Sequence, residues 1–149
     1  MDWKYVAGFF DGEGTITKAE KRYRIYVTQT SREVLDSICQ LADVGSVKPI
    51  KKRKSHWQNA WVYYITDKHK IRYFLRQVYP YLVVKKQLAS KALEDIDEKI
   101  TNDYRRTEIK KSRIQKITSL RAQGLSYRAI GKEMNIDWGY ARKLVKGLK

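Results

Sequence analysis

The segment Tyr5–Gly14, YVAGFFDGEG, constrains the fold of this chain most, because an apolar helix pattern runs directly into two acids spaced by glycines. The apolar positions predict a helix over residues 3–12. Gly8 and Gly12 each cost about 1 kcal/mol relative to alanine inside a helix. Lying four residues apart, they share one helix face. A face without side chains lets a second backbone approach closely, so the pattern predicts a tightly packed helix pair.

The second helix of that pair is expected to be a copy of the first, from another subunit. No other segment of the chain has this pattern, so the copies would pack about a two-fold axis. The expected homodimer interface contains Ala7, Gly8, Asp11 and Gly12. The acids of both copies, including Glu13, would meet at the helix ends. Clustered carboxylates repel each other unless a divalent cation lies between them, and oxygen-rich sites suit Mg²⁺.

The charge of the chain points to a polyanionic partner. A net charge of +16 over 149 residues opposes compaction unless a polyanion neutralises it. Nucleic acid is therefore the expected partner, with an anionic membrane surface as the alternative. No apolar run reaches the ~18 residues of a membrane span, and we expect no membrane association. The lone Cys39 cannot form an internal disulfide, which fits a reducing, intracellular setting.

Residues 1–98 show helical and alternating hydrophobic periods in turn. The expected elements are a helix over 3–12, strands over 14–19 and 23–30, a helix over 31–42 opened by a Thr30–Glu33 capping box, strands over 46–52 and 59–66, a helix capped by Asp67 and ended by Pro80, and a helix over 85–100. This αββαββα order predicts an α+β unit with one antiparallel sheet covered by helices on a single face.

The second strand is expected to have two unlike faces. Alternate residues point to opposite sides of a sheet, which puts Tyr23, Ile25 and Val27 toward the core. The other face would carry basic and hydrogen-bonding side chains, from Arg22, Arg24, Tyr26 and Thr28. One side of the sheet is thus expected to be core and the other a binding platform.

The last third of the chain is more basic than the rest. Residues 100–149 hold 13 Lys and Arg against 4 Asp and Glu, compared with 19 against 12 in residues 1–99. We expect a basic linker over 99–111, either a minor-groove arm or a solvated charge run. Residues 112–149 predict a small all-α helix-turn-helix domain, with any three-helix bundle as the alternative. Its expected inward residues are Ala129, Ile130, Ile136 and Leu144. The expected recognition helix presents Tyr140, Arg142, Lys143 and Lys146, with Trp138 either on that surface or in the core.

Val6–Gly14 resembles, position by position in character, the LAGLIDADG motif of homing endonucleases. The likeness covers roughly residues 1–98 and extends to the order of helices and hairpins. One motif per chain implies the homodimeric branch of that family, with an antiparallel, saddle-shaped sheet. Residues 112–149 resemble the helix-turn-helix domains of invertase- and resolvase-type recombinases.

The resemblance implies a catalytic site at the end of the first helix. Glu13 would bind a catalytic Mg²⁺ or Mn²⁺ together with the carbonyl of Gly12. Glu13 stands where many members have Asp, a longer arm that keeps the chemistry and shifts the geometry. Gln29 would orient the attacking water, and Lys85 would stabilise developing charge.

Three further positions follow from the same resemblance. Lys86 stays an alternative to Lys85, and Arg32 is a weaker candidate for the same pocket. Asp11 would be structural, as a cap that hydrogen-bonds across the dimer interface.

The implied function is site-specific cleavage of double-stranded DNA by a homing endonuclease, encoded by an intron, an intein or a free-standing gene. The homodimer would cut a long pseudo-palindromic site and would take no small-molecule substrate. The expected DNA contacts are Arg22, Arg24, Tyr26, Thr28, Arg32 and Lys48, besides the recognition helix. Two alternatives stay open: a non-cleaving LAGLIDADG and helix-turn-helix transcription regulator, and an RNA-splicing maturase. The expected location is the cytoplasm of a bacterial or phage-infected cell, or an organelle.

Overall fold

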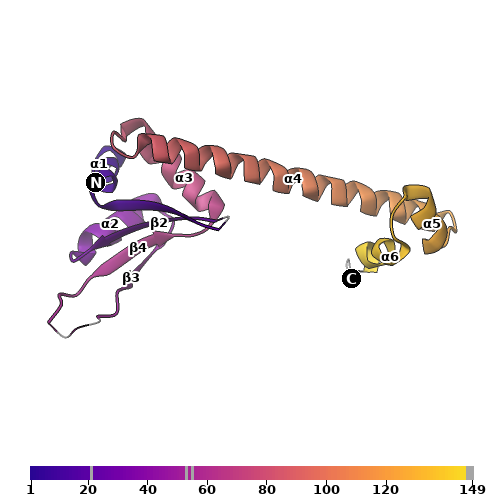
Figure 1. Ribbon diagram of the computed structural model, residues 1–149, viewed down its shortest axis with the longest axis horizontal. Helices are drawn as coiled ribbons and strands as arrows, with labels where there is room; N and C mark the ends of the chain where they lie inside the picture. Colours follow the sequence, from indigo (N-terminus) through magenta and orange to yellow (C-terminus); the bar gives the residue numbers. More distant parts are fainter. Residues whose placement is uncertain (21, 53, 55, 147–149) are drawn as a thin grey trace. The chain divides into compact units, whose positions relative to one another are not determined.

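The computed structural model describes residues 1–20, 22–52, 54 and 56–146. The chain forms two compact units, Met1–Glu98 and Lys99–Lys149. In chain order the elements are α1 (Trp3–Glu13), β1 (Gly14–Ala19), β2 (Arg22–Gln29), α2 (Arg32–Ala42), β3 (Ser46–Pro49), β4 (Trp61–Ile65), α3 (Lys68–Val78), the 3-10 turn η1 (Tyr79–Tyr81), α4 (Lys86–Ala122), α5 (Tyr127–Met134) and α6 (Trp138–Lys146) (Figure 1). The αββαββα order of the first unit, and with it the α+β fold class, is confirmed.

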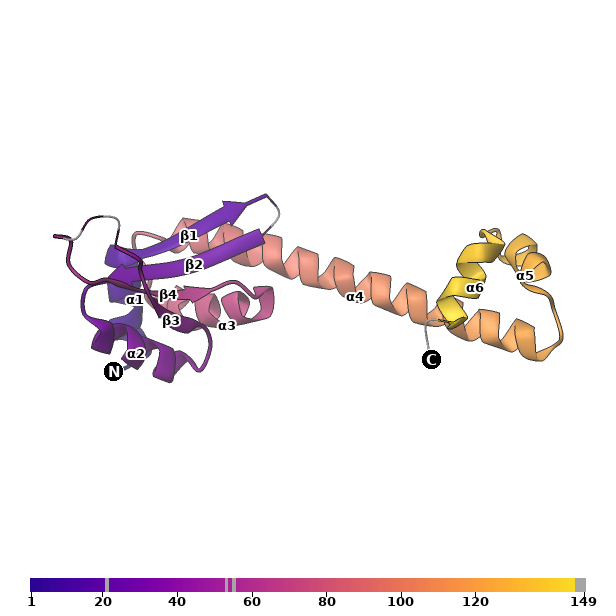
Figure 2. The same ribbon diagram turned by 90° about the horizontal axis from the view of Figure 1, so that it is seen from below.

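The four strands form one antiparallel sheet in the order β1-β2-β4-β3. The two hairpins therefore meet through β2 and β4, with Tyr26 opposite Tyr64 and Gln29 opposite Trp61. Helices α2 and α3 lie on one side of this sheet (Figure 2), where α2 contacts β3 and β4 and α3 contacts β2. Only one face of the sheet is covered, as antiparallel sheets allow.

The core of the first unit lies between the sheet and the helices. Its centre is aromatic: the Phe74 ring lies edge-on to Phe10, with 5.4 Å between ring centroids, and 6.0 Å from Tyr63. These three side chains are at most 1% exposed, and burying a side chain of this size stabilises the fold by about 1.5–3 kcal/mol. The core joins residues from α1, β4 and α3, which fixes α1 against the rest of the unit.

The two helix starts that were expected to be capped differ. Asp67 caps α3 as predicted, because its carboxylate accepts hydrogen bonds from the backbone N–H groups of His69 (2.9 Å) and Lys70 (3.0 Å). The predicted Thr30–Glu33 capping box at α2 is wrong: the N-cap is Ser31, without a side-chain hydrogen bond. Thr30 donates instead to its neighbour Gln29. A competing local acceptor has replaced the box.

The predicted helix end near residue 100 and the linker over 99–111 are also wrong. Helix α4 is continuous over 37 residues, Lys86–Ala122. That stretch contains no Gly or Pro, and its Lys, Arg and Glu residues are good helix formers. Contacts one turn apart add support: the Lys111 ammonium lies 2.9 Å from Glu108. The absence of an apolar face in this stretch reflects solvent exposure of the helix and not a loss of helical structure. Because these residues are helical, they do not form an extended arm.

The second unit has its own small core. Ile117 and Leu120 of α4 pack with Ile130, Ala141 and Leu144 of the short helices. Helix α5 is capped by Ser126, whose hydroxyl accepts from the N–H of Ala129 at 3.2 Å. Ala129 itself was expected to point inward and is exposed. Gly131 and Ala141, both buried, lie inside instead.

A close approach of α5 and α6 depends on glycine. A Cβ on Gly131 would come within 2.8 Å of the Ile136 carbonyl oxygen and 3.2 Å of the Trp138 Cα. The turn between the helices begins at Asn135, whose φ of 50° lies in the left-handed region that Asn tolerates better than most residues. The two helices are therefore joined tightly by a short turn over Asn135, Ile136 and Asp137.

Candidate active site and nucleic-acid interface

The end of α1 is shaped by Gly14. A Cβ there would lie 2.0 Å from the Phe10 Cδ2 and 2.6 Å from the Phe10 carbonyl oxygen, so only glycine fits without displacing a buried ring. Because Gly14 is also the first residue of β1, the chain passes from helix to strand with no loop. Glu13 is thereby held at this corner with its side chain exposed. Among the residues that the structure describes, Glu13 makes no hydrogen bond or ion pair.

Asp11 connects α1 to the segment just before α4. Its carboxylate accepts three hydrogen bonds, from the backbone N–H groups of Val83 (2.6 Å), Val84 (3.1 Å) and Lys85 (2.9 Å). Burial alone would raise the pKa of this carboxyl. The three N–H donors and the nearby Lys85 charge outweigh burial and hold the pKa of Asp11 below its usual value.

Lys85 returns to the same point with its side chain. Its Nζ donates to the backbone carbonyl of Asp11. The neighbouring Lys86 lies elsewhere, with its Nζ 5.6 Å from the centre of the Tyr79 ring. Of the two lysines that the sequence left open, Lys85 is thus the one beside α1.

Gln29 reaches this end of the unit through the sheet register. Gly14 lies opposite Val27 in the β1–β2 ladder, so Gln29, the last residue of β2, ends beside the corner that holds Glu13. Its side-chain oxygen accepts from the Thr30 N–H (2.8 Å) and hydroxyl (3.3 Å). Three elements thus bring Glu13, Gln29 and Lys85 to the carboxyl end of α1.

The glycine face of α1 is exposed. A Cβ at Gly8 or Gly12 would have no atom within 4 Å, and Tyr5 on the same side is 50% exposed. The expectation that Ala7 belongs to this face is wrong, because Ala7 is 0% exposed and lies in the core of its own chain. The Asp11 carboxylate makes the three bonds described above within the chain, and its expected hydrogen bonds across the dimer interface stay a prediction.

The uncovered face of the sheet carries the predicted basic residues. Arg22, Arg24, Thr28 and Lys48 are exposed and Tyr26 is half-buried. Arg22, Arg24 and Tyr26 line a shallow groove on this sheet together with Tyr64 and Thr66.

Two groove residues were missed from the sequence, Tyr64 and Thr66. The signal that could have found Tyr64 is strand alternation combined with the sheet order, since Tyr64 pairs directly with Tyr26. Its ring also lies 5.1 Å from the Lys48 Nζ. Arg32, by contrast, begins α2 and pairs with Asp36 at 3.1 Å, both side chains being about half exposed.

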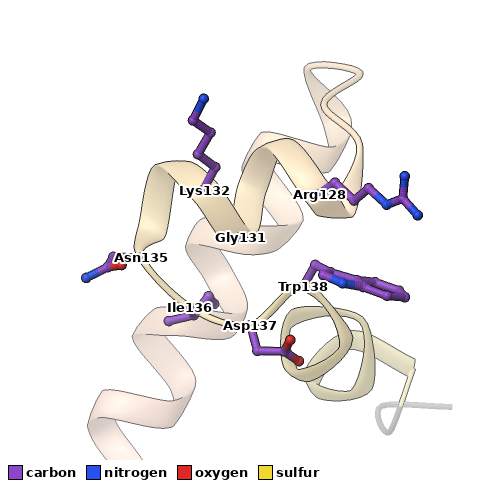
Figure 3. Close-up of a pocket in the computed structure, with 7 residues that line it drawn as sticks. All are labelled: Arg128, Gly131, Lys132, Asn135, Ile136, Asp137 and Trp138. Atoms are coloured by element: carbon purple, nitrogen blue, oxygen red, sulfur yellow. The ribbon is translucent and has the colours of Figure 1, made fainter.

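The second unit presents an exposed α6. Arg142, Lys143 and Lys146 are exposed at its surface, and Tyr140 is 41% exposed. Trp138 is 47% exposed, so of its two expected positions the surface one holds. The Arg128 guanidinium lies 5.8 Å from the centre of its ring, at an open groove along the α5–α6 turn (Figure 3).

Two features of the described residues limit the chemistry of the chain. In this part of the chain, no group of three or more His, Cys, Asp and Glu residues is placed to hold a metal ion. Across the same residues, every helix is too short or too polar to cross a membrane.

Comparison with known proteins gives one family and one fold. A family model described as LAGLIDADG-like domain matches residues 2–79. No curated protein matches the sequence significantly. The homing endonuclease I-CvuI, solved in complex with the I-CreI target, is 19% identical; the match covers 98% of this chain and 93% of that one, with a TM-score of 0.53. The archaeal intron-encoded homing endonuclease I-Vdi141I, complexed with DNA, is 17% identical, with 97% and 94% covered and a TM-score of 0.53.

A longer relative matches about two thirds of this chain. The LAGLIDADG meganuclease I-AabMI, bound to uncleaved DNA, is 23% identical, and the match covers 66% of this chain but only 38% of that one, with a TM-score of 0.53. At these identities the solved structures establish the fold of homing endonucleases. The family model covers more than half of the sequence, and the chain therefore belongs to the LAGLIDADG-like domain family.

Proposed function

We propose that this chain is a site-specific endonuclease that cuts double-stranded DNA as a homodimer and requires a divalent cation. The observation that supports the proposal is the Lys85 ammonium bound to a carbonyl in the last turn of α1, the helix that ends at Glu13, on a unit whose open sheet face is basic. The β1–β2 register, which pairs Gly14 with Val27, supports the inclusion of Gln29 in the same site. The similar solved structures include homing endonucleases in complex with DNA targets, which supports the same substrate class here.

The open sheet face is proposed to bind the major groove. Arg22 and Arg24 carry the charge that phosphates and guanine edges attract, and Tyr26 and Tyr64 add flat, hydrogen-bonding surface between them. The face is a paired antiparallel ladder, so its side chains stand at fixed spacing. A rigid row of donors of this kind favours sequence readout over loose electrostatic binding.

The homodimer is proposed to form through the exposed glycine face of α1. Gly8 and Gly12 leave room above the helix backbone, and a second copy of α1 would fill it with its own backbone. Val83 and Val84, bonded to Asp11 at the edge of this face, are 82% and 78% exposed. Covering such apolar side chains would add to the stability of the pair.

The donor set at Glu13 fits a hard cation. The Glu13 carboxylate is exposed and has no partner among the described residues, and the Gly12 carbonyl lies one residue before it. Oxygen donors alone are what Mg²⁺ and Mn²⁺ prefer. Within its described residues one chain supplies few such donors, which supports a site completed by the second subunit. When bound there, the cation would act as a Lewis acid toward the scissile phosphate.

Lys85 and Gln29 are proposed to complete the reaction site. The Lys85 ammonium, held at the end of α1, would stabilise the negative charge that develops on the phosphate. Gln29 has its carbonyl oxygen bound by Thr30, so its amide N–H groups are the part available to orient water or a phosphate oxygen. Amide orientation follows here from the hydrogen bonds of Thr30.

The second unit is proposed to be a helix-turn-helix that lengthens the DNA footprint. The tight α5–α6 turn and the cations at the surface of α6 support this. Because α6 carries none of the residues proposed for the reaction, its contribution is expected in affinity and not in bond cleavage.

The decisive test is cleavage of a pool of supercoiled plasmids with randomised inserts. We expect linear product at selected inserts with Mg²⁺ or Mn²⁺, and none after chelation with EDTA. Binding of duplex DNA without any cleavage in either metal would favour the transcription regulator. Preference for intron RNA over duplex DNA would favour the maturase.

A further inference from the structure

The two ends of Lys85 are both bound to Asp11. The main-chain N–H of Lys85 donates to the Asp11 carboxylate at 2.9 Å, and the side-chain Nζ donates to the Asp11 carbonyl. The residues are 74 positions apart in the sequence, so this is a tertiary clamp and not a local turn. A free lysine side chain has about 2 kcal/mol of rotamer entropy, which the clamp removes before any substrate binds.

Asp11 anchors the segment that leads into α4. Lys85 precedes α4, and its carbonyl accepts the first helical bond, from the N–H of Ala89 at 2.9 Å. The side chain of Lys85 cannot accept a hydrogen bond, so it offers no cap to the N–H groups that begin α4. The Asp11 carboxylate accepts the N–H groups of Lys85 and of the two residues before it, all of which precede the first residue of α4. The direction in which α4 begins, and hence the position of the Lys85 Cα, depends on this one carboxylate.

The Lys85 ammonium is held at the carboxyl end of α1, close to the proposed reaction site. The Asp11 carbonyl lies in the last turn of α1, two residues before Glu13. Carbonyls at a helix carboxyl end carry partial negative charge and attract a cation. The ammonium of Lys86, one residue later, lies over Tyr79. The selection of Lys85 over Lys86 is therefore made by Asp11.

We propose that Asp11 is the positioning residue for Lys85. It sets the ammonium at the carboxyl end of α1, where the site needs it, and does not itself touch the DNA. This inference rests on the proposed function for its catalytic consequence, but the clamp can be measured without cleavage.

The first experiment measures the clamp in the intact chain. Lys85 and Lys86 are acetylated with a limiting amount of an N-hydroxysuccinimide ester, and their labelling rates are compared by mass spectrometry. In Asp11→Asn the rate at Lys85 should rise relative to Lys86 by about fivefold, the factor for one lost hydrogen bond. An unchanged ratio would overturn the inference.

A matched control separates the positioning of Lys85 from the general destabilisation caused by losing a carboxylate that binds backbone N–H groups. Asp67 caps α3 with the same chemistry, a carboxylate bound to backbone N–H groups, and its bonds are to His69 and Lys70 of its own helix. Asp67→Asn should lower stability comparably while leaving the Lys85-to-Lys86 ratio as in wild type. A raised ratio in this variant too would mean that any destabilisation frees Lys85, which also overturns the inference.

The second experiment measures the catalytic consequence as a double-mutant cycle. Single-turnover rates at saturating plasmid substrate and Mg²⁺ are compared for wild type, Asp11→Asn, Lys85→Met and the double variant. Misplacing a reacting group by 1 Å can cost about 10²-fold, and we expect that loss in Asp11→Asn with DNA affinity nearly unchanged. If Asp11 acts through Lys85, the same change in the Lys85→Met background should cost almost nothing. Equal losses in both backgrounds would refute positioning.

Two further outcomes are separate from a failure of the positioning proposal: a wild-type chain that does not cut DNA, and an Asp11→Asn variant that does not fold. A wild-type chain that never cuts would end the proposed nuclease function, while the labelling ratio would still decide whether Asp11 holds Lys85. If Asp11→Asn does not fold, Asp11→Glu keeps a carboxylate one methylene longer and is measured in the same way. Asp11→Glu should give a Lys85-to-Lys86 labelling ratio between those of wild type and Asp11→Asn. A wild-type labelling ratio together with a wild-type cleavage rate would contradict the requirement for the exact position of the Asp11 carboxylate.

Discussion

The two units of this chain use their charges differently. Met1–Glu98 holds 18 Lys and Arg against 12 Asp and Glu, and Lys99–Lys149 holds 14 against 4. In the first unit, ion pairs join separate elements: Lys18 of β1 lies 2.5 Å from Asp95 of α4, and Arg76 of α3 lies 3.0 Å from Asp97. These paired charges hold separate elements of the first unit together.

The second unit leaves the cations of α6 to solvent or to a partner. Its Glu108–Lys111 pair runs along a single helix and joins no two elements. Arg142, Lys143 and Lys146 of α6 make no ion pair with any residue that the structure describes. The first unit has an aromatic core and the second a small aliphatic one. In the proposed function the first unit supplies fixed geometry and the second supplies electrostatic attraction.

The largest expected effect is on bond cleavage and lies in the first unit. Glu13→Gln should reduce cleavage by roughly 10³-fold, because it removes a metal-binding charge and no groove contact. DNA binding should be retained, and it should tighten slightly without metal because a carboxylate near phosphate is lost. Plasmid cleavage in Mg²⁺ and gel-shift titration measure the two. Near wild-type cleavage by Glu13→Gln would remove the catalytic assignment.

The next effect is on assembly. Gly8→Leu should convert the proposed dimer to a monomer, because a bulky side chain holds the two α1 backbones apart. In the single chain that position is open, with no atom within 4 Å of a Cβ, so the monomer should stay folded. Sedimentation velocity and far-UV circular dichroism check the two statements. A Gly8→Leu variant that stays dimeric would show the interface to lie elsewhere.

The third prediction compares the cations of the two units directly. Replacing Arg142, Lys143 and Lys146 by Ala removes six cations from the proposed dimer, and should lower the salt slope of log affinity by up to ~5.4, at ~0.9 per phosphate contact. The set of cleaved inserts should not change, and protection should be lost only at the outer ends of the footprint. Arg22→Ala with Arg24→Ala should instead broaden the set of cleaved inserts. Identical changes from both variants would erase the proposed division of labour.

The fourth prediction concerns the stability of the second unit alone. Gly131→Ala puts a Cβ within 2.8 Å of a backbone carbonyl oxygen, and such overpacking costs about 1–3 kcal/mol. Hydrogen exchange should rise in α5 and α6 and stay unchanged in the sheet. Cleavage at low salt should persist. Gly139→Ala is the milder control, since its Cβ would approach only one side-chain atom, the Asp137 Oδ1 that accepts from the N–H of Tyr140, at 3.0 Å.

The smallest expected effect is a difference in pH dependence between two helix caps. The N–H of Lys70, with that of His69, outweighs burial and holds the pKa of Asp67 below its usual value. A lowered folded-state pKa gives stability that is present above the unfolded value of about 3.9 and lost as pH falls through the folded value. The cost of Asp67→Asn should therefore shrink in acid. Ser126 caps α5 with a hydroxyl, so Ser126→Ala should cost about 1 kcal/mol at every pH. Melting temperatures between about pH 7 and about pH 2 compare the two, on either side of the carboxyl titration.

Local patterns in the sequence determined most of the first unit. Alternation over residues 23–30 predicted which side of β2 is buried, and the acid at position 67 predicted where α3 begins. Such features depend on neighbours within a few residues, so the chain itself carries them. The same reasoning failed where a local signal was ambiguous: the charged stretch after residue 98 was interpreted as a linker although nothing in it breaks a helix.

Tertiary structure decided how the site is assembled. That Ala7 faces the core while Gly8 faces out depends on the rotation of α1 against Phe74 and the sheet, which a motif of alternating small and apolar residues does not specify. The choice of Lys85 over Lys86 depends on Asp11, 74 residues away. Contacts between residues so far apart in the sequence form only once the core has placed both helices. Before that, no local interaction favours one side-chain conformation of Lys85 or Lys86 over another. The sequence by itself determined which chemistry the chain carries, and packing decided which atoms meet.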